Sequence, residues 1–147
     1  MNASPEYQFV DANILIYAHD RSAGLKNERA LKLIKNLWES GNGCLSIQVL
    51  QEFYVSITQK VTKPLDRETA AKVISSLSAW KVHTPSVDDI LGAIEIQQQY
   101  IISFWDAMII QSAQQQGCPV LWTEDLNSGQ VYAGVKAVNP FLETAHA

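Results

Sequence analysis

The sequence contains only two cysteines and lacks several other features that identify common classes of protein. The two cysteines, Cys44 and Cys118, lie far apart and form no Cys-x-x-Cys pair, which argues against a disulfide framework or a zinc site. No apolar run approaches the roughly 20 residues that a membrane helix needs, and the start of the chain has no signal-peptide pattern. We therefore expect a cytoplasmic protein without a membrane segment, in which both cysteines are small buried hydrophobic residues.

The motifs of several common chemistries are also absent. The sequence has no Gly-x-x-x-x-Gly-Lys phosphate loop and no Gly-x-Gly-x-x-Gly dinucleotide fingerprint. Its three histidines lack metal-ligand spacing and have no evident serine or cysteine partner. These absences leave the carboxylates as the main candidates for chemistry.

Four acidic residues interrupt apolar stretches in four separate parts of the chain. Asp11 follows Phe-Val, Glu52 lies within Val-Leu-Gln-Glu-Phe-Tyr-Val, Asp106 follows Ser-Phe-Trp, and Asp125 follows Val-Leu-Trp-Thr-Glu. A carboxylate taken out of water without a partner carries a large desolvation penalty, so it is usually paired or bound to a metal. None of the four runs contains a basic residue. If the four acids converge, a hard divalent cation, Mg²⁺ or Mn²⁺, is their natural counter-charge.

The overall charge does not decide whether the protein binds nucleic acid. The net charge is −4, from 11 basic and 15 acidic residues, which taken alone argues against it. Bound cations would cancel the four embedded acids, however. Basic residues concentrate between positions 21 and 35, where Lys26, Arg29 and Lys32 share one region. These three form either a solvated helix face or a rim that contacts RNA phosphates.

Short apolar strands alternate with amphipathic helices along the chain. Strands are predicted near residues 8–10, 44–46, 81–84, 119–123 and 134–138, and helices over 27–40, 47–60, 66–77, 86–100 and 103–117. This order predicts a single α/β domain over residues 1–147, with a mainly parallel sheet of about five strands and helices on both faces.

The four acids are predicted to share one edge of this sheet, where ligands of such folds bind. Asp11 and Asp125 follow strands, whereas Glu52 and Asp106 lie in the first turns of helices. Each also has an ordinary explanation. Asp11 could cap a helix that begins at Ala12, Asp106 could complete a capping box with Ser103, Glu52 could belong to a polar stripe, and Asp125 could be a turn residue.

Neighbouring polar residues could support such a site. Asn13 and Thr123 could orient water or metal-bound groups, or they could form ordinary turn and strand-end hydrogen bonds. Glu124 competes with Asp125 as the fourth acid. Three or four carboxylates of this kind can hold one or two Mg²⁺ or Mn²⁺ ions and leave positions for water and phosphate oxygens.

Taken in order, these segments resemble the PIN domain, and within it the VapC-like toxins of toxin–antitoxin pairs. The matching pieces are Phe-Val-Asp-Ala-Asn-Ile-Leu-Ile-Tyr at 9–17, Ser-Ile-Gln-Val-Leu-Gln-Glu-Phe-Tyr at 46–54, Ile-Ser-Phe-Trp-Asp-Ala at 102–107, Leu-Trp-Thr-Glu-Asp-Leu at 121–126, Gly-Gln at 129–130 and Val-Asn-Pro-Phe at 138–141. The resemblance implies a Rossmann-like PIN fold and Mg²⁺- or Mn²⁺-dependent RNA cleavage. It carries the four family acids onto Asp11, Glu52, Asp106 and Asp125. It also implies a homodimer and a small antitoxin partner.

Three other readings compete with a toxin ribonuclease. A PIN-type nuclease could have a housekeeping role without an antitoxin. A phosphotransfer fold fits poorly, because Asp-Ala-Asn at residues 11–13 replaces the Asp-x-Asp that dehalogenase-like enzymes need, and Lys136 is the only late lysine. A non-catalytic RNA- or protein-binding module is disfavoured, because a pure RNA binder gains nothing from four acids that repel phosphate.

Overall fold

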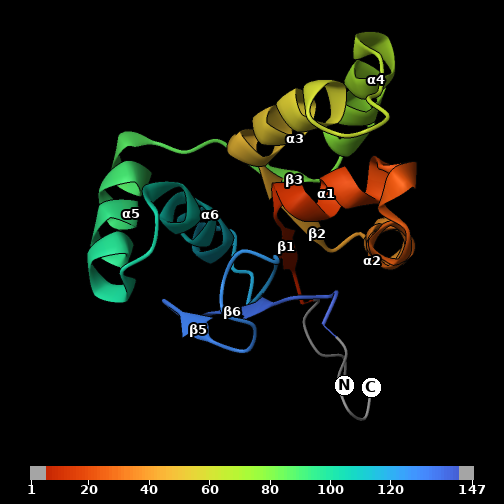
Figure 1. Cartoon of the computed structure of the whole chain (residues 1–147). Helices are drawn as coiled ribbons and strands as arrows, with labels where there is room; N and C mark the ends of the chain where they lie inside the picture. Colours follow the sequence, from red (N-terminus) through yellow and green to blue (C-terminus); the bar gives the residue numbers. More distant parts are fainter. Residues whose placement is uncertain (1–5, 143–147) are drawn as a thin grey trace.

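A six-stranded sheet, in the order β3-β2-β1-β4-β6-β5, runs through the centre of the computed structural model (Figure 1). The structure describes residues 6–142, so His146 lies outside it. The strands are β1 (Gln8–Val10), β2 (Gly43–Ser46), β3 (Lys81–His83), β4 (Val120–Trp122), β5 (Val131–Tyr132) and β6 (Val135–Val138). Every neighbouring pair is parallel except β5 and β6, which are antiparallel. The predicted mainly parallel sheet is confirmed.

Helices cover both faces of the sheet. They are α1 (Ala12–His19), α2 (Leu25–Ser40), α3 (Ile47–Gln59), α4 (Arg67–Leu77), α5 (Val87–Tyr100) and α6 (Phe104–Gln115), with a short 3₁₀ helix η1 (Arg21–Ala23). Figure 1 shows α1 and α2 on one side of the sheet and α5 and α6 on the other. The predicted two-sided arrangement is therefore also confirmed. Between residues 6 and 142, no helix is both long and apolar enough to span a membrane.

The sheet has one strand more than the sequence predicted. The additional strand, β5, has two residues and pairs with β6 across Ala133 and Gly134. Both turn residues have positive φ, 51° and 83°, as a tight hairpin turn requires. The prediction missed β5 because two residues are too few to show an alternating pattern. The first long helix also begins at Leu25, two residues before its predicted start.

The apolar residues of the strands and helices pack into one core. Phe9, Leu45 and Leu121 from the three central strands are fully buried, and so are Ile14 and Ile110 from helices on opposite faces. Each such side chain contributes about 1.5–3 kcal/mol by leaving water. Cys44 and Cys118 are buried free cysteines, as predicted.

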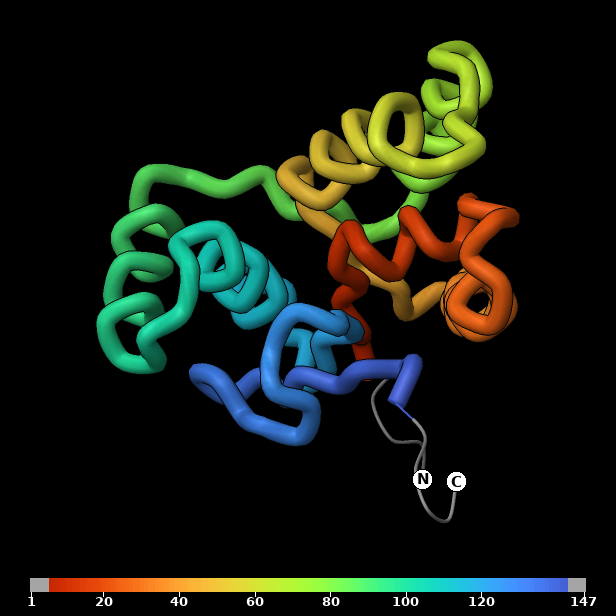
Figure 2. The backbone as a smooth tube through the Cα atoms, viewed as in Figure 1, coloured from red at the N-terminus to blue at the C-terminus, as the bar shows by residue number. Residues whose placement is uncertain are grey.

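Two helices that begin with or carry a predicted site acid start directly after a strand. The chain turns from β1 directly into α1 and from β2 directly into α3, as the tube in Figure 2 shows. Asp11 and Ser46 are the N-caps of these two helices. Since β1, β2 and β4 are parallel neighbours, their carboxyl ends share one edge of the sheet. The fold therefore brings segments from both ends of the chain to a common position.

Candidate active site

Asp11 is the most deeply buried of the four predicted acids. It lies between β1 and α1, with 6% of its surface exposed. Its Oδ1 accepts a hydrogen bond from the backbone N of Ala12 at 2.7 Å, and its Oδ2 accepts one from the Thr123 hydroxyl at 2.8 Å. Burial nevertheless raises the pKa of Asp11 to about 7. Asp11 thus caps α1 and also places a buried carboxylate at the edge of the sheet.

Asn13 and Thr123 connect Asp11 to Asp125. The Asn13 amide donates to Asp125 Oδ2 at 3.0 Å and lies 3.4 Å from the Thr123 hydroxyl oxygen. The backbone N of Asp125 donates to the same hydroxyl at 3.1 Å. The Thr123 side chain is fully buried, whereas Asp125 is exposed. This network holds the segment after β4 against the beginning of α1.

Glu52 lies in the second turn of α3, on an exposed face. The Gln48 amide lies 3.4 Å from Glu52 Oε1 and 3.3 Å from the backbone oxygen of Trp105, so it links α3 to the first turn of α6. Partial burial raises the pKa of Glu52, and the charges of Asp106 and Asp125 add to the increase, while Lys60 offsets part of it. Gln48 was not predicted as a site residue, since a neutral amide leaves no charge signal in a sequence.

Asp106 occupies the first turn of α6. Its backbone N donates to the hydroxyl of the N-cap Ser103 at 3.0 Å. Burial raises the pKa of the Asp106 carboxyl, and the charge of Asp125 raises it further, while a hydrogen bond with Ser103 opposes both effects. Ser103 therefore caps α6, whereas within residues 6–142 no hydrogen bond from the Ser103 backbone N to the Asp106 carboxylate completes the predicted capping box.

The four carboxylates form a mutually repelling group. The charges of Asp125 and Glu52 both raise the pKa of Asp11, and the charge of Asp125 also raises those of Glu52 and Asp106. Within residues 6–142, none of the four forms an ion pair with a basic residue. Four acids from four separate elements therefore lie within electrostatic range without a paired cation.

The donor atoms suit a hard divalent cation, although they are not gathered into a coordination shell. Every candidate ligand is an oxygen, as Mg²⁺ and Mn²⁺ prefer. The Asn13 Oδ1 beside Asp125 is buried without a hydrogen-bond partner. In the described part of the chain, however, no three His, Cys, Asp or Glu side chains are close enough together to hold a metal ion. The residues fit the chemistry of such a cation, but their carboxylates would have to move together to bind it.

Glu124 turns away from the other acids. Its Oε1 accepts a hydrogen bond from the Tyr17 hydroxyl at 2.6 Å, and its Oε2 lies 2.9 Å from the Lys26 ammonium. Lys26 also lies over the ring of Tyr17, 4.8 Å from its centroid. Of the two adjacent acids, Asp125 is therefore the one that faces Asn13 and the carboxylate group.

Arg29 and Lys32, two of the three basic residues considered for RNA contact, lie on one face of α2. With Leu33, Asn36, Trp122 and Pro140 they line a shallow depression of about 330 Å³. One Arg29 nitrogen donates to the backbone oxygen of Phe141 at 2.9 Å. Trp122, one of the lining residues, directly precedes Thr123 in the chain.

His83 has partners that the sequence did not reveal. Its Nδ1 lies 2.8 Å from the Ser112 hydroxyl, and its Nε2 lies 3.1 Å from Asp89 Oδ2. No serine partner was evident in the sequence because β3 and α6 meet only in the folded chain. Ser112 is 1% exposed, so no substrate can reach its hydroxyl, and the contact is structural.

Comparison with known proteins places the fold. The PIN domain family model matches residues 9–133. A toxin–antitoxin complex from Klebsiella pneumoniae is 21% identical, with a TM-score of 0.65, and the match covers 91% of this chain and 98% of that one. VapC20 of Mycobacterium tuberculosis, a toxin described as cleaving the sarcin–ricin loop, is 19% identical, with a TM-score of 0.61 and coverage of 88% and 98%. DNA-bound VapBC from Salmonella typhimurium is 17% identical, with a TM-score of 0.62 and coverage of 90% and 97%. The search of curated proteins gives no match.

Proposed function

Because the chain belongs to the PIN domain family, we propose that it is an endoribonuclease that depends on Mg²⁺ or Mn²⁺, and the toxin of a toxin–antitoxin pair. The observation that carries this proposal is the group of four carboxylates, whose charges raise the pKa values of Asp11, Glu52 and Asp106, and which have no paired cation among residues 6–142. Such a group is costly unless a cation neutralises it. The structural relatives, which are toxins and toxin–antitoxin complexes, favour the same reading.

The four acids Asp11, Glu52, Asp106 and Asp125 would hold one or two divalent cations. Such cations, when bound, supply an activated water and neutralise charge on the phosphodiester. Thr123 and Asn13 keep the carboxylates of Asp11 and Asp125 oriented through hydrogen bonds of 2.8 and 3.0 Å. Gln48 links Glu52 to the first turn of α6, where Asp106 lies. Glu124 supports this arrangement from outside the acidic group.

Cleavage of an RNA panel tests the proposal. Purified protein without any partner would be incubated with mixed tRNA and rRNA and either Mg²⁺ or Mn²⁺. We expect discrete cleavage that is lost in EDTA and in the Asp11→Asn and Asp106→Asn variants. Asp88→Asn, which changes an exposed acid in the first turn of α5, is the matched control and should retain activity. Cleavage that persists in both site variants would refute the assignment.

The depression beside Trp122 is proposed to contact RNA next to the cleaved bond. Arg29 and Lys32 contribute positive charge to its lining, while Trp122 and Pro140 contribute apolar surface, a combination suited to a phosphate and a base. Lys32→Ala should weaken RNA binding and reduce its salt slope by about 0.7–1. Lys35→Ala, an exposed position on the same helix outside the depression, should change neither. Both would be measured in the Asp106→Asn background, which leaves RNA uncut.

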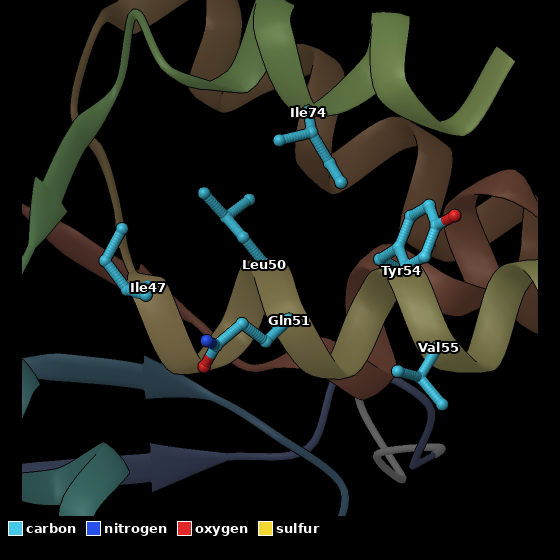
Figure 3. A pocket seen from close by; sticks show the side chains of 6 residues that line it. All are labelled: Ile47, Leu50, Gln51, Tyr54, Val55 and Ile74. Carbon is cyan, nitrogen blue, oxygen red and sulfur yellow. The ribbon is translucent and has the colours of Figure 1, made fainter. Parts of the chain in front are cut away.

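An apolar groove between α3 and α4 is a suitable binding place for the antitoxin. It has a volume of about 400 Å³ and is lined by Ile47, Leu50, Gln51, Tyr54, Val55 and Ile74, with Leu50 and Ile74 facing each other across it (Figure 3). A second depression shares Gln51 and Val55 and extends to Glu52. An antitoxin segment in the groove could therefore continue to the acidic site. Val55→Glu should abolish inhibition by a candidate antitoxin without reducing cleavage, whereas Val131→Glu on β5 should leave inhibition intact.

Homodimerisation through α5 is also proposed. Val87, Leu91 and Ile94 recur at helical spacing along α5 and are 72%, 56% and 38% exposed, which forms an apolar stripe typical of a protein interface. Leu91→Glu should convert a dimer to a monomer in light scattering. Leu31→Glu, at a 48% exposed position on α2, should not.

Two alternatives give different results in these experiments. A housekeeping PIN nuclease would cleave RNA but would not be inhibited by an antitoxin, and its expression alone would not arrest growth. A non-catalytic binding module would bind RNA without cutting it at any metal concentration. An RNA substrate and a toxin role both agree with the expected cytoplasmic location.

A further inference from the structure

We infer that Tyr17, Lys26 and Glu124 form a positioning cluster that fixes Asp125 in the active site, and that Lys26 is therefore not an RNA contact. The inference rests on the proposed function, because Asp125 is one of the four acids assigned to the cation. It assigns Lys26 a role within the protein in place of the RNA contact considered from the sequence. It also assigns a role to Glu124, which the sequence left as a competitor of Asp125 for the fourth acid.

Side chains at the start of α1 contact, in order, the residues that follow β4. Asn13 and Tyr17 lie one turn apart on α1, so they share one face of the helix. They hydrogen-bond to adjacent residues, Asn13 to Asp125 at 3.0 Å and Tyr17 to Glu124 at 2.6 Å. Asp11 binds the preceding residue, Thr123. Three consecutive residues are thus each held by a side chain from α1 or its N-cap.

The adjacent side chains of Glu124 and Asp125 point toward different partners, Tyr17 and Asn13. Neither residue belongs to a helix or strand, so side-chain contacts rather than a backbone ladder define where their carboxylates point. The contact with Tyr17 fixes Glu124 on the outer side of the segment. Its neighbour Asp125 is thereby directed toward Asn13 and the other acids. Without the contact between Tyr17 and Glu124, the Glu124 carboxylate could take the place of the Asp125 carboxylate at the site.

The charge of Lys26 is engaged by groups of the protein itself. Lys26 lies 2.9 Å from Glu124 and 3.4 Å from the Tyr17 hydroxyl, and its ammonium lies over the rings of Tyr17 and Phe141 at 4.8 and 5.5 Å. The lysine charge is therefore used within the protein and neutralises what would be a fifth negative charge at the edge of the site. A partly exposed ion pair adds little to global stability, so its effect should appear at the site rather than in the melting temperature.

Calorimetric titration of the full chain with Mn²⁺, together with RNA binding measured in EDTA, tests the inference. We expect Lys26→Met and Tyr17→Phe each to weaken Mn²⁺ binding by about tenfold, as loss of a supporting residue behind a metal ligand does. Lys26→Arg, which keeps the charge, should bind Mn²⁺ like the wild type. Lys35→Met, the matched charge deletion on α2, should also leave Mn²⁺ binding unchanged, and the two methionine variants should bind RNA equally well.

The outcomes separate this inference from the proposed function. If Lys26→Met and Tyr17→Phe bind Mn²⁺ like the wild type while Asp125→Asn does not, the positioning role is refuted and the proposed metal site stands. If Lys26→Met loses more RNA affinity than Lys35→Met and keeps its Mn²⁺ affinity, Lys26 is an RNA contact and the inference is wrong. A wild-type protein that binds no Mn²⁺ would overturn the proposed function itself.

Discussion

Ionisation of Asp11 should destabilise the metal-free protein as pH rises. Burial raises the pKa of this 6% exposed carboxyl from 3.8 to about 7. Because the folded state retains the proton to a higher pH than the unfolded state, the free energy of unfolding falls from about pH 4 and levels off above about pH 7. At 1.36 kcal/mol per pKa unit, the whole effect is about 4 kcal/mol, of which about 3 kcal/mol falls between pH 5 and pH 8.

Replacing Asp11 by Asn should remove this pH dependence. Asparagine is neutral and keeps an oxygen that can accept the 2.7 Å capping bond from the backbone N of Ala12. The altered contact with Thr123 should cost about 1–2 kcal/mol. We therefore expect Asp11→Asn to match the wild type near pH 5 and to exceed it by about 3 kcal/mol at pH 8 in EDTA, by the same pKa arithmetic.

Urea unfolding monitored by tryptophan fluorescence would measure both profiles at several values between pH 5 and pH 8. Asp88→Asn, an exposed substitution on α5, should follow the wild-type profile. A wild-type unfolding free energy that stays constant over this range would contradict the reasoning. So would an Asp11→Asn profile that falls in parallel with the wild type, because the penalty would then arise elsewhere.

Three further outcomes are expected from the same group of carboxylates. Mg²⁺ or Mn²⁺ at about a hundredfold excess over its Kd should add about 3 kcal/mol to the unfolding free energy and raise Tm by roughly 10 °C. EDTA should reverse this shift. An unchanged Tm at millimolar metal would remove the main support for a shared site. Asp106→Asn should stabilise the metal-free protein, because burial and the charge of Asp125 raise the pKa of Asp106; thermal melting in EDTA would show this, and a lower Tm would count against it. Gln48→Ala should weaken Mn²⁺ binding by about tenfold by releasing Glu52 from α6, whereas Gln98→Ala, an exposed change on α5, should not.

The sequence was informative where an acid interrupts an apolar run. Asp11 and Asp125 follow buried strands, and the parallel order of those strands was enough to predict one shared edge. Tertiary contacts between neutral or oppositely charged residues left no comparable signal. The sequence favoured Asp125 as the fourth acid and kept Glu124 as a competitor, and the contacts of Glu124 with Tyr17 and Lys26 now separate the two.

The basic face of α2 shows a related limit. The sequence grouped Lys26, Arg29 and Lys32 in one basic region, but closeness in sequence cannot reveal that Lys26 is paired with Glu124, which lies 98 residues away in the chain. The partners of His83 were missed for the same reason, because Ser112 approaches it only when α6 packs against the sheet. Local patterns specify elements and charges, whereas long-range packing decides which charges remain available.

The pairing of β1 with β4 has a consequence for the order in which the protein is made. Asp11 and Thr123 are 112 residues apart, so a ribosome has produced most of the chain before the two halves of the site can meet. A nascent chain that ends before β4 holds Asp11, Glu52 and Asp106 but lacks Asp125 and the Thr123 hydroxyl. Contacts this distant in sequence also form slowly. If the chain is the toxin we propose, its host is protected during translation itself, because cleavage activity arises only after the last strands leave the ribosome.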